Sequence, residues 1–223
     1  MAKNILFILS DQHNKAVAGA YGNLVARTPN LDRLAAGGTV FSRAYANCPL
    51  CCPARAALAT GKYVHQTEHW NNAFAYSGKP QSWAHRLREA GHRIDAIGKL
   101  HFKSAQDDNG FTEEHNTLHV VDGQGNLSGN LRHDTTIFDK RKGVLEAGVG
   151  ESMYTRYDSQ NADLAAEWIR ARAGGAEPWT LMLGIALPHP PNVVPQEYFD
   201  LYKDADIPMP PQWRSENWPR PVW

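Results

Sequence analysis

The sequence predicts an α/β protein built on a doubly wound, mostly parallel sheet with helices on both faces. Two observations support this class. Short apolar runs alternate with segments that carry helix-capping residues and apolar side chains at helical spacing. Polar residues follow the ends of several apolar runs, and doubly wound proteins hold their sites at the carboxyl ends of the strands. We therefore expect a site along one edge of the sheet.

Residues 4–61 contain two predicted strands and two predicted helices. Residues 4–10 form an apolar run without helical period, which is typical of a strand buried on both faces of a parallel sheet. A cap residue, a first-turn proline and a glycine pair predict a helix over 28–38. Residues 40–46 are expected to form the next strand. A proline start and a glycine end then predict a helix over 53–61.

Residues 82–187 continue the alternation, with one irregular region within them. A helix is expected over 82–90 and a strand over 93–98. Residues 104–150 are rich in Gly, Asn, Asp and Thr, which indicates long loops or a hairpin excursion. A helix is expected over 158–172 and a buried strand over 179–187. These elements complete the order expected of a doubly wound sheet.

Length and composition narrow the class of protein further. The 223 residues are enough for one α/β domain, or part of one, and residues 207–223 form a proline-rich tail that predicts an extended surface arm. Lysine plus arginine equals aspartate plus glutamate at 23 each, which argues against nucleic acid as a partner. The apolar stretch 5–9 is too short for a leader or a membrane span, so we expect a cytoplasmic protein without membrane attachment.

All three cysteines lie within five positions, at Cys48, Cys51 and Cys52. An odd number of cysteines, two of them adjacent, is unsuited to a framework of disulfide bonds. We therefore expect a reactive thiol. Cys51 opens the pattern C-x-P-x-R-x4-T-G, with Pro53 and Arg55 at its third and fifth positions. A nucleophile there would lie at a helix N-terminus, where free N–H groups and the dipole favour sulfate or phosphate, and Arg55 adds a fixed positive charge.

This pattern resembles the maturation and active-site motif of the sulfatase family, within the alkaline phosphatase superfamily. The resemblance implies an alkaline phosphatase-like fold and oxidation of Cys51 to formylglycine by a formylglycine-generating enzyme. Of the three cysteines only Cys51 has proline two positions on and arginine four positions on. Two other interpretations stay open: a buried cysteine pair in a strand-to-helix turn, and an unmodified thiolate nucleophile.

Asp11 and Gln12 follow the first predicted strand, where sulfatases carry an acidic pair that binds a divalent cation. The resemblance implies that Asp11, Gln12 and the modified Cys51 bind such an ion, calcium first, with manganese or magnesium as alternatives. Glutamine departs from the common second aspartate. Its amide oxygen suits a hard cation but brings no charge. This Asp-Gln form is similar to choline sulfatases and phosphonate monoester hydrolases.

Three further segments resemble elements of the same family. Gly-Lys-x-His at 98–101 implies that Lys99 binds sulfate oxygens and that His101 acts as a base, although a solvated strand end has the same pattern. A Pro-His pair implies that His189 contacts the leaving group as an acid, although prolines also simply terminate strands. Trp-Asn-Asn-Ala at 70–73 is similar to a choline sulfatase segment and implies that Asn72 contacts the substrate.

The prediction is a sulfatase-like hydrolase, a sulfuric ester hydrolase acting on small-molecule sulfate esters. A phosphonate monoester or phosphodiester hydrolase on the same scaffold is the first alternative, and a non-catalytic truncated remnant is the second. Family members are longer and carry a second metal-binding pair, an Asp followed by His or Asn, in their later half. We therefore expect residues 1–223 to be the N-terminal portion of a catalytic domain, inactive alone, with a C-terminal half or a homo-oligomer as partner.

Overall fold

The computed structural model describes residues 3–123, 125 and 147–209. The chain divides into two compact units, one from residues 1–13 and 43–194 and the other from residues 14–42 and 195–223. The sheet and every candidate site residue named above belong to the first unit.

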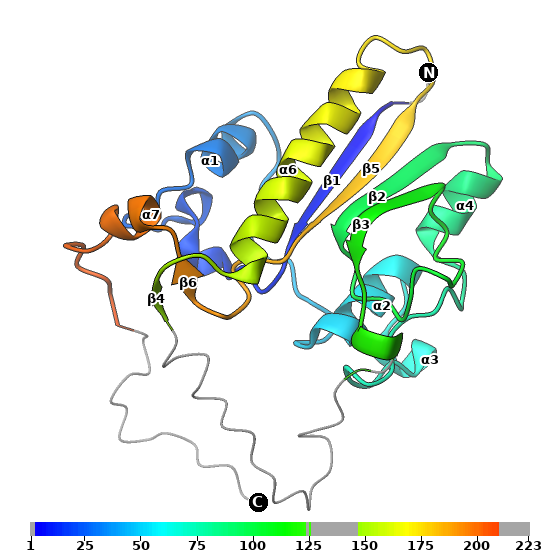
Figure 1. Ribbon diagram of the computed structural model, residues 1–223, viewed down its shortest axis with the longest axis horizontal. Coiled ribbons are helices and arrows are strands. Elements are labelled where there is room, and N and C mark those ends of the chain that lie inside the picture. Colours follow the sequence, from blue (N-terminus) through cyan, green and yellow to red (C-terminus); the bar gives the residue numbers. More distant parts are fainter. Residues whose placement is uncertain (1–2, 124, 126–146, 210–223) are drawn as a thin grey trace, which may run out of the picture. The chain divides into compact units, whose positions relative to one another are not determined.

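The first unit contains a four-stranded sheet in which all strands run parallel (Figure 1). Its strands are β1 (Ile5–Ser10), β2 (Arg93–Lys99), β3 (Glu113–Leu118) and β5 (Trp179–Ile185), in the order β1-β5-β2-β3. The last residue of β1 lies opposite the last residue of β5, and Gly98 of β2 lies opposite Gly184 of β5. The carboxyl ends of these strands therefore meet at one edge of the sheet.

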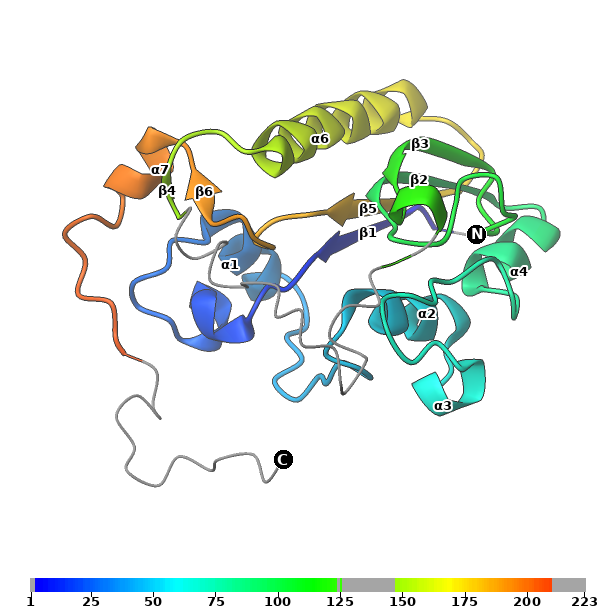
Figure 2. The same cartoon turned by 60° about the horizontal axis from the view of Figure 1, so that its bottom comes forward.

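Helices cover both faces of this sheet, as Figure 2 shows. The long helix α6 (Met153–Arg172) lies on one face, and α2 (Cys51–Thr60) and α4 (Trp83–Glu89) lie on the other. Shorter elements complete the unit: α3 (Val64–Thr67), η3 (Val121–Gly123), β4 (Gly148–Val149) and β6 (Val193–Val194). The predicted class, a parallel α/β sheet wound on both faces, is confirmed.

The two sides of the core follow the alternation of side chains along the strands. Ile94 and Ala96 of β2 pack with α2 and α4, whereas Ile97 packs with α6. On β5, Met182 belongs to the first cluster and Leu181 to the second. Both central strands are thus buried on their two faces, which explains the apolar residues on both sides of β2 and β5.

Two glycines allow the central strands to approach closely just before the site. Gly98 has φ +84, and a Cβ there would overlap the carbonyl oxygen of Gly184. A Cβ at Gly184 would in turn overlap the carbonyl group of Lys99. Only glycine fits these two positions, so they fix the backbone that presents Lys99.

The second unit is smaller and consists of η1 (Lys15–Val17), η2 (Gly19–Tyr21), α1 (Pro29–Ala36) and α7 (Gln196–Asp200). The Thr28 hydroxyl donates to Asp32 and accepts from the Gly19 N–H, which ties η2 to the start of α1. The Arg27 N–H donates to the Tyr202 hydroxyl at 2.9 Å, so the two segments of this unit are joined directly.

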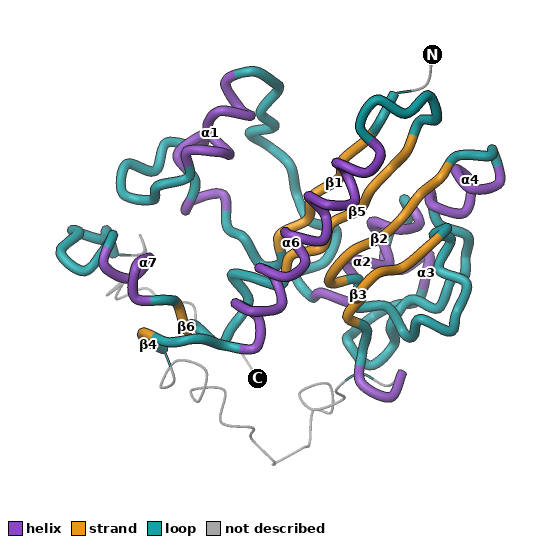
Figure 3. The backbone as a smooth tube through the Cα atoms, turned by 45° about the horizontal axis from the view of Figure 1, so that its top comes forward, coloured by secondary structure: helices purple, strands orange, loops and turns teal. Residues whose placement is uncertain are grey.

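Two strand predictions need correction. Residues 40–46 form no strand and appear as loop in Figure 3, because their aromatic side chains are exposed, Tyr45 to 87%. β1 is a strand as predicted, but it is not buried on both faces. It lies at the edge of the described sheet, and Ile5 and Ile8 are about half exposed at 50% and 51%.

The boundaries of other elements also differ from the prediction. α2 begins at Cys51 rather than at residue 53, and α6 begins at Met153 rather than at residue 158. The region 104–150 contains the strand β3 (Glu113–Leu118). Its polar sequence shows no strand pattern, because β3 lies at the other edge of the sheet.

Residues 126–146 and 210–223 lie outside the described part, and residues 207–209 form neither helix nor strand. Within the described ranges, no helix combines the length and apolar character needed to cross a bilayer.

Candidate active site

Three charged side chains meet where the carboxyl ends of β1 and β2 face the helix α2. The Asp11 carboxylate accepts hydrogen bonds from Lys99 Nζ at 2.6 Å and from Arg55 Nη2 at 3.1 Å. Lys99 and Arg55 are buried, with Lys99 only 1% exposed, and the Asp11 side chain is 10% exposed. Arg55 also donates to the carbonyl oxygens of Lys99 and Leu100, so its guanidinium fixes the end of β2. Two cations facing one carboxylate leave a net positive charge.

The ion pairs control the ionisation of Asp11. Burial by itself raises the pKa of this carboxyl group, but the hydrogen bond from Lys99 and the charges of Lys99 and Arg55 outweigh it. The net result is a pKa of Asp11 below its usual value. Asp11 is therefore an anion at neutral pH and is available as an oxygen ligand.

Cys51 is the first residue of α2, in line with the expectation of a nucleophile at a helix N-terminus. Its Sγ lies 3.5 Å from the Asn72 side-chain oxygen, which also accepts the Cys52 N–H at 3.1 Å. Asn72, predicted from resemblance to contact the substrate, thus also fixes the first turn of the helix. Cys48 lies outside the helix, before its N-cap residue Leu50.

The two adjacent thiols have opposite acidities. A hydrogen bond from Cys52, with further help from His101 and the charge of Lys99, lowers the pKa of Cys51 to about 3. The same hydrogen bond and burial raise the pKa of Cys52 far above its usual value. Before any modification, Cys51 is therefore the thiolate of the pair and Cys52 the thiol.

His101 lies beyond the end of β2, where the backbone takes φ +55. Its N–H donates to the Leu118 carbonyl at 2.7 Å, which fixes this turn against the end of β3. Its side chain contributes to the low pKa of Cys51, and its Nδ1 is buried without a hydrogen-bond partner among the described residues. The predicted Lys99 and His101 thus lie together beside Cys51.

His189 follows β5, and its position depends on a residue that the sequence analysis did not single out. The Asp158 carboxylate of α6 accepts the N–H groups of Ala186 and Leu187 at 2.8 and 2.7 Å. The segment that carries His189 is thereby fixed to the helix. His189 Nδ1 donates to the Pro190 carbonyl at 2.7 Å, which leaves Nε2 for a ligand. A buried acid on the apolar side of a predicted helix is the signal that could have revealed Asp158.

Tyr154 is a second residue that the sequence did not indicate. Its ring lies 5.8 Å from Lys99 Nζ and meets the ring of His189 edge-on, with 5.8 Å between centroids. Burial and the negative charges of Asp11 and Cys51 raise the pKa of its hydroxyl group. Tyr154 thus borders the charged site from the first turn of α6. It was missed because α6 begins five residues earlier than predicted.

A cavity of about 1050 Å³ opens beside Asp11 and Cys51. Its opposite wall includes Tyr45, Asn47 and Tyr63. These side chains come from the loops on either side of α2. The cavity therefore offers room for the part of a ligand that lies beyond the charged groups.

Two residues of the site can supply part of the coordination shell of a hard divalent cation. Asp11 offers carboxylate oxygens, and Gln12, exposed at φ +62, offers an amide oxygen. Oxygen donors of this kind suit calcium, which takes about six to eight of them. Asp11 and Gln12 therefore account for part of such a site, and a modified residue 51 would add oxygen donors.

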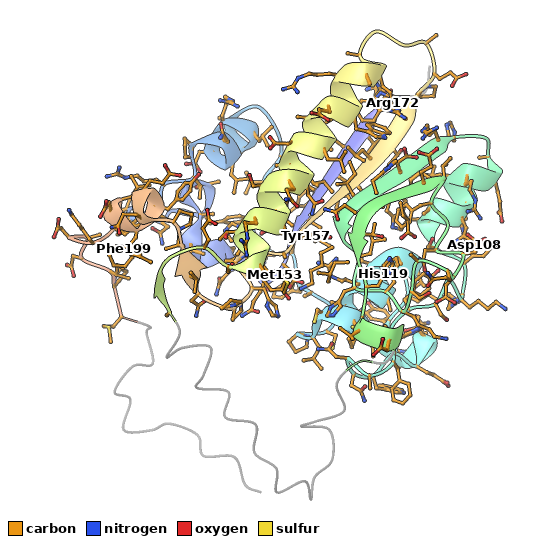
Figure 4. All side chains as sticks on the ribbon, viewed as in Figure 1. Asp108, His119, Met153, Tyr157, Arg172 and Phe199 are labelled. Atoms are coloured by element: carbon orange, nitrogen blue, oxygen red, sulfur yellow. The ribbon has the colours of Figure 1, made fainter. Side chains whose placement is uncertain are left out.

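The chain contains one Asp-Asn-Gly sequence, at 108–110. Asp108 lies beside α4 (Figure 4), and its carboxylate accepts two hydrogen bonds from Arg88 at 2.8 and 2.7 Å. The Asn109 amide donates to Ser104 and Glu114. This pair stabilises a turn and does not contribute to the cluster around Asp11.

The fold and the candidate site together define an α/β protein with a positively charged cluster and a low-pKa cysteine at the carboxyl edge of a parallel sheet. The chain belongs to the sulfatase family, whose sequence model matches residues 3–211. It is 30% identical over 192 residues to arylsulfatase K of Danio rerio and covers 34% of that protein, with 84% of this chain aligned. It is 31% identical over 213 residues to choline-sulfatase of Rhizobium meliloti (strain 1021), covering 91% of this chain and 41% of that protein.

A solved structure supports the same fold. The phosphonate monoester hydrolase of Agrobacterium radiobacter superimposes with a TM-score of 0.66 at 23% identity, over 93% of this chain and 45% of that one. The predicted resemblance to the sulfatase family and its alkaline phosphatase-like fold is confirmed. The chain spans less than half the length of these relatives.

Proposed function

We propose that the chain is the N-terminal portion of a sulfatase-like catalytic domain that hydrolyses small-molecule sulfate esters. The observation that carries this proposal is the convergence of Lys99 and Arg55 on Asp11 at one edge of the sheet, beside a cavity that Cys51 also lines. The family membership and the two sulfatase relatives support it. The chain covers 34% and 41% of those two relatives, and apolar side chains of β1 are exposed. Both observations support a catalytic domain that has a further C-terminal part.

A formylglycine at residue 51, made by a formylglycine-generating enzyme, would supply a hydrated aldehyde as nucleophile, and a divalent cation bound by Asp11 and Gln12 would polarise the sulfate oxygens. Calcium suits these oxygen donors best, with manganese or magnesium as alternatives. Residue 51 begins α2, where the helix dipole favours an anion.

The remaining steps fall to side chains of this chain. Lys99 and Arg55 stabilise negative charge on the sulfate oxygens, because Asp11 neutralises only one of their two charges. His189 donates a proton to the leaving alcohol through Nε2, since its Nδ1 is bound to the Pro190 carbonyl. His101, beside residue 51, would take the proton of the second hydroxyl group of the hydrated aldehyde. Loss of this proton would expel sulfate and restore the aldehyde. The cavity wall of Tyr45 and Tyr63 receives the alcohol part of the ester.

A phosphonate monoester or phosphodiester hydrolase is the second candidate. The Asp11-Gln12 pair favours it, because this form is similar to that of phosphonate monoester hydrolases. The similarity in fold to a phosphonate monoester hydrolase is compatible with it. The two candidates share every residue named above and differ in the relative rates on the two ester classes.

The test uses the full-length protein, produced together with a formylglycine-generating enzyme and assayed with an aryl sulfate and an aryl phenylphosphonate. We expect a higher kcat/KM on the sulfate, loss of activity in Cys51→Ala and unchanged activity in Cys48→Ala. A higher kcat/KM on the phosphonate would favour the second candidate. Failure to hydrolyse either ester, with no bound divalent cation, would support a non-catalytic remnant and contradict both.

A further inference from the structure

A cluster of three potential metal ligands remains unexplained by the proposed hydrolysis. The Sγ atoms of Cys51 and Cys52 and a ring nitrogen of His101 all lie within 4.8 Å of one another. We call this set the thiol cluster. Cys52 has no role in the proposed reaction, and it is 1% exposed. The cluster exists only while Cys51 still carries its sulfur.

The protein positions each member of the thiol cluster firmly. Cys51 and Cys52 open α2, and the Cys52 N–H is bound by Asn72. The Cys52 thiol lies 3.5 Å from the His101 carbonyl oxygen, so the helix start and the turn after β2 are in contact. The His101 backbone is fixed by its bond to Leu118. A ligand would therefore find the three donors already assembled, at little entropic cost.

The imidazole of His101 has one nitrogen without a partner among the described residues, and Zn²⁺ could bind the ring through that atom. Its Nδ1 is buried and has no hydrogen-bond partner in the ranges that the structure covers. Buried polar side-chain atoms almost always have a partner, so such an atom calls for an explanation. A bound metal ion beside the two sulfur atoms would give the imidazole a ligand.

The chemistry of these donors selects a different ion from the one proposed for hydrolysis. Two sulfurs and an imidazole nitrogen suit Zn²⁺ or Cd²⁺, whereas the oxygens of Asp11 and Gln12 suit calcium. Two thiolates would balance the charge of the ion. The nearest cations, Lys99 and Arg55, are held on Asp11 at 2.6 and 3.1 Å. The Asn72 oxygen, 3.5 Å from Cys51 Sγ, or a water molecule would complete four ligands.

We propose that, before Cys51 is converted, Cys51, Cys52 and His101 bind a thiophilic divalent cation such as Zn²⁺. Binding forms two metal–sulfur bonds and one metal–nitrogen bond and releases the remaining thiol proton to solvent. Conversion of Cys51 removes one sulfur and abolishes the site. The inference does not depend on the activity of the mature protein.

The first test needs no variant and uses the full-length protein made without a maturing enzyme and treated with a chelator. The protein is alkylated with N-ethylmaleimide with and without Zn²⁺, and the three cysteines are followed by peptide mass spectrometry. We expect Zn²⁺ to slow the labelling of Cys51 and Cys52 at least tenfold and to leave Cys48 unchanged. Ca²⁺ should give no such protection. Equal labelling of Cys51 with and without Zn²⁺ would overturn the proposal.

The second test measures the metal–sulfur bonds directly. Titration with Cd²⁺ should produce a thiolate-to-metal absorption band that saturates at one ion per chain. Cys52→Ser should weaken Cd²⁺ binding by about tenfold or more, as should His101→Ala, whereas Cys48→Ser is the matched control and should bind like the wild type. A circular dichroism spectrum checks that each variant is folded. An unaltered affinity in folded Cys52→Ser would overturn the proposal.

Discussion

The Lys99 ammonium lies 2.6 Å from the Asp11 carboxylate, and the two side chains meet where β1 and β2 end. Arg55 approaches the same carboxylate oxygen from α2 at 3.1 Å. This arrangement joins three elements that are far apart in the sequence. It also leaves one positive charge unbalanced beside the first residue of α2. An anion bound there would offset this positive charge.

Removal of the Asp11 charge should destabilise the protein severely. Asp11→Asn leaves Lys99 and Arg55 buried without a counter-ion, and breaking a buried pair in this way costs about 3–5 kcal/mol. The measurement is the free energy of unfolding in denaturant. Asp108→Asn is the matched control, because Asp108 also pairs with an arginine but is 63% exposed, and we expect a cost below about 1 kcal/mol there. Equal losses in the two variants would contradict the role of burial.

The lowered pKa of Asp11 sets the direction of the pH dependence. Its pKa in the folded protein lies below the usual value of 3.8, so its stabilising contribution is complete at pH values above the usual one. That contribution is lost as the pH falls through the lower, folded pKa. We expect the free energy of unfolding of the metal-free protein to fall with acid, and Asp11→Asn to flatten this dependence. Parallel acid dependences in the wild type and the variant would count against the assignment.

Cys51 should react as a thiolate in the unmodified, metal-free protein. Because its pKa is lowered to about 3, the rate of its alkylation by iodoacetamide should change little between about pH 8 and pH 5. In the denatured chain the same rate should fall about tenfold for each pH unit below the usual thiol pKa of about 8.5. The readout is mass spectrometry of the labelled peptides.

Cys52 provides the internal check on this reactivity. Its hydrogen bond is the largest cause of the low pKa of Cys51, so Cys52→Ala should raise that pKa and restore a pH-dependent rate. Cys52→Ser keeps a hydroxyl donor and should behave like the wild type. A pH-dependent rate in the wild-type protein would disprove the thiolate assignment.

Asp158 should be essential for the order of the segment that carries His189. Asp158→Ala leaves the N–H groups of Ala186 and Leu187 without an acceptor, at a cost of about 1–3 kcal/mol for each buried group. Hydrogen exchange at these two amides should accelerate strongly. Asp163→Ala, at an exposed position of the same helix, should change stability by no more than about 0.5 kcal/mol. Unchanged exchange at both amides in Asp158→Ala would refute this role.

Continuous apolar runs and cap residues were enough to predict the parallel sheet and its main helices. β2 and β5 are buried on both faces, so their sequences carry an unambiguous signal. β3 was missed because an edge strand with polar side chains has no such pattern. The segment 40–46 was mistaken for a strand because exposed aromatic residues resemble a buried apolar run.

For the candidate site, the strand ends and the cysteine pattern placed Asp11, Cys51 and Lys99 correctly at one edge. The sequence could not reveal that Lys99 and Arg55 share the Asp11 carboxylate, because such pairing depends on register and on how α2 packs. Nor could it reveal Tyr154 and Asp158. These residues reach the site from α6, more than 50 positions after Lys99, and only the packing of that helix on the sheet brings them there.

The most direct test of the central claim is fragmentation mass spectrometry of the tryptic peptide 44–55, which contains all three cysteines. The protein is produced with and without a formylglycine-generating enzyme. The account predicts that Cys51 alone becomes an aldehyde, only when the enzyme is present, while Cys48 and Cys52 keep their sulfur. Three unmodified thiols in the presence of the active enzyme would contradict the account.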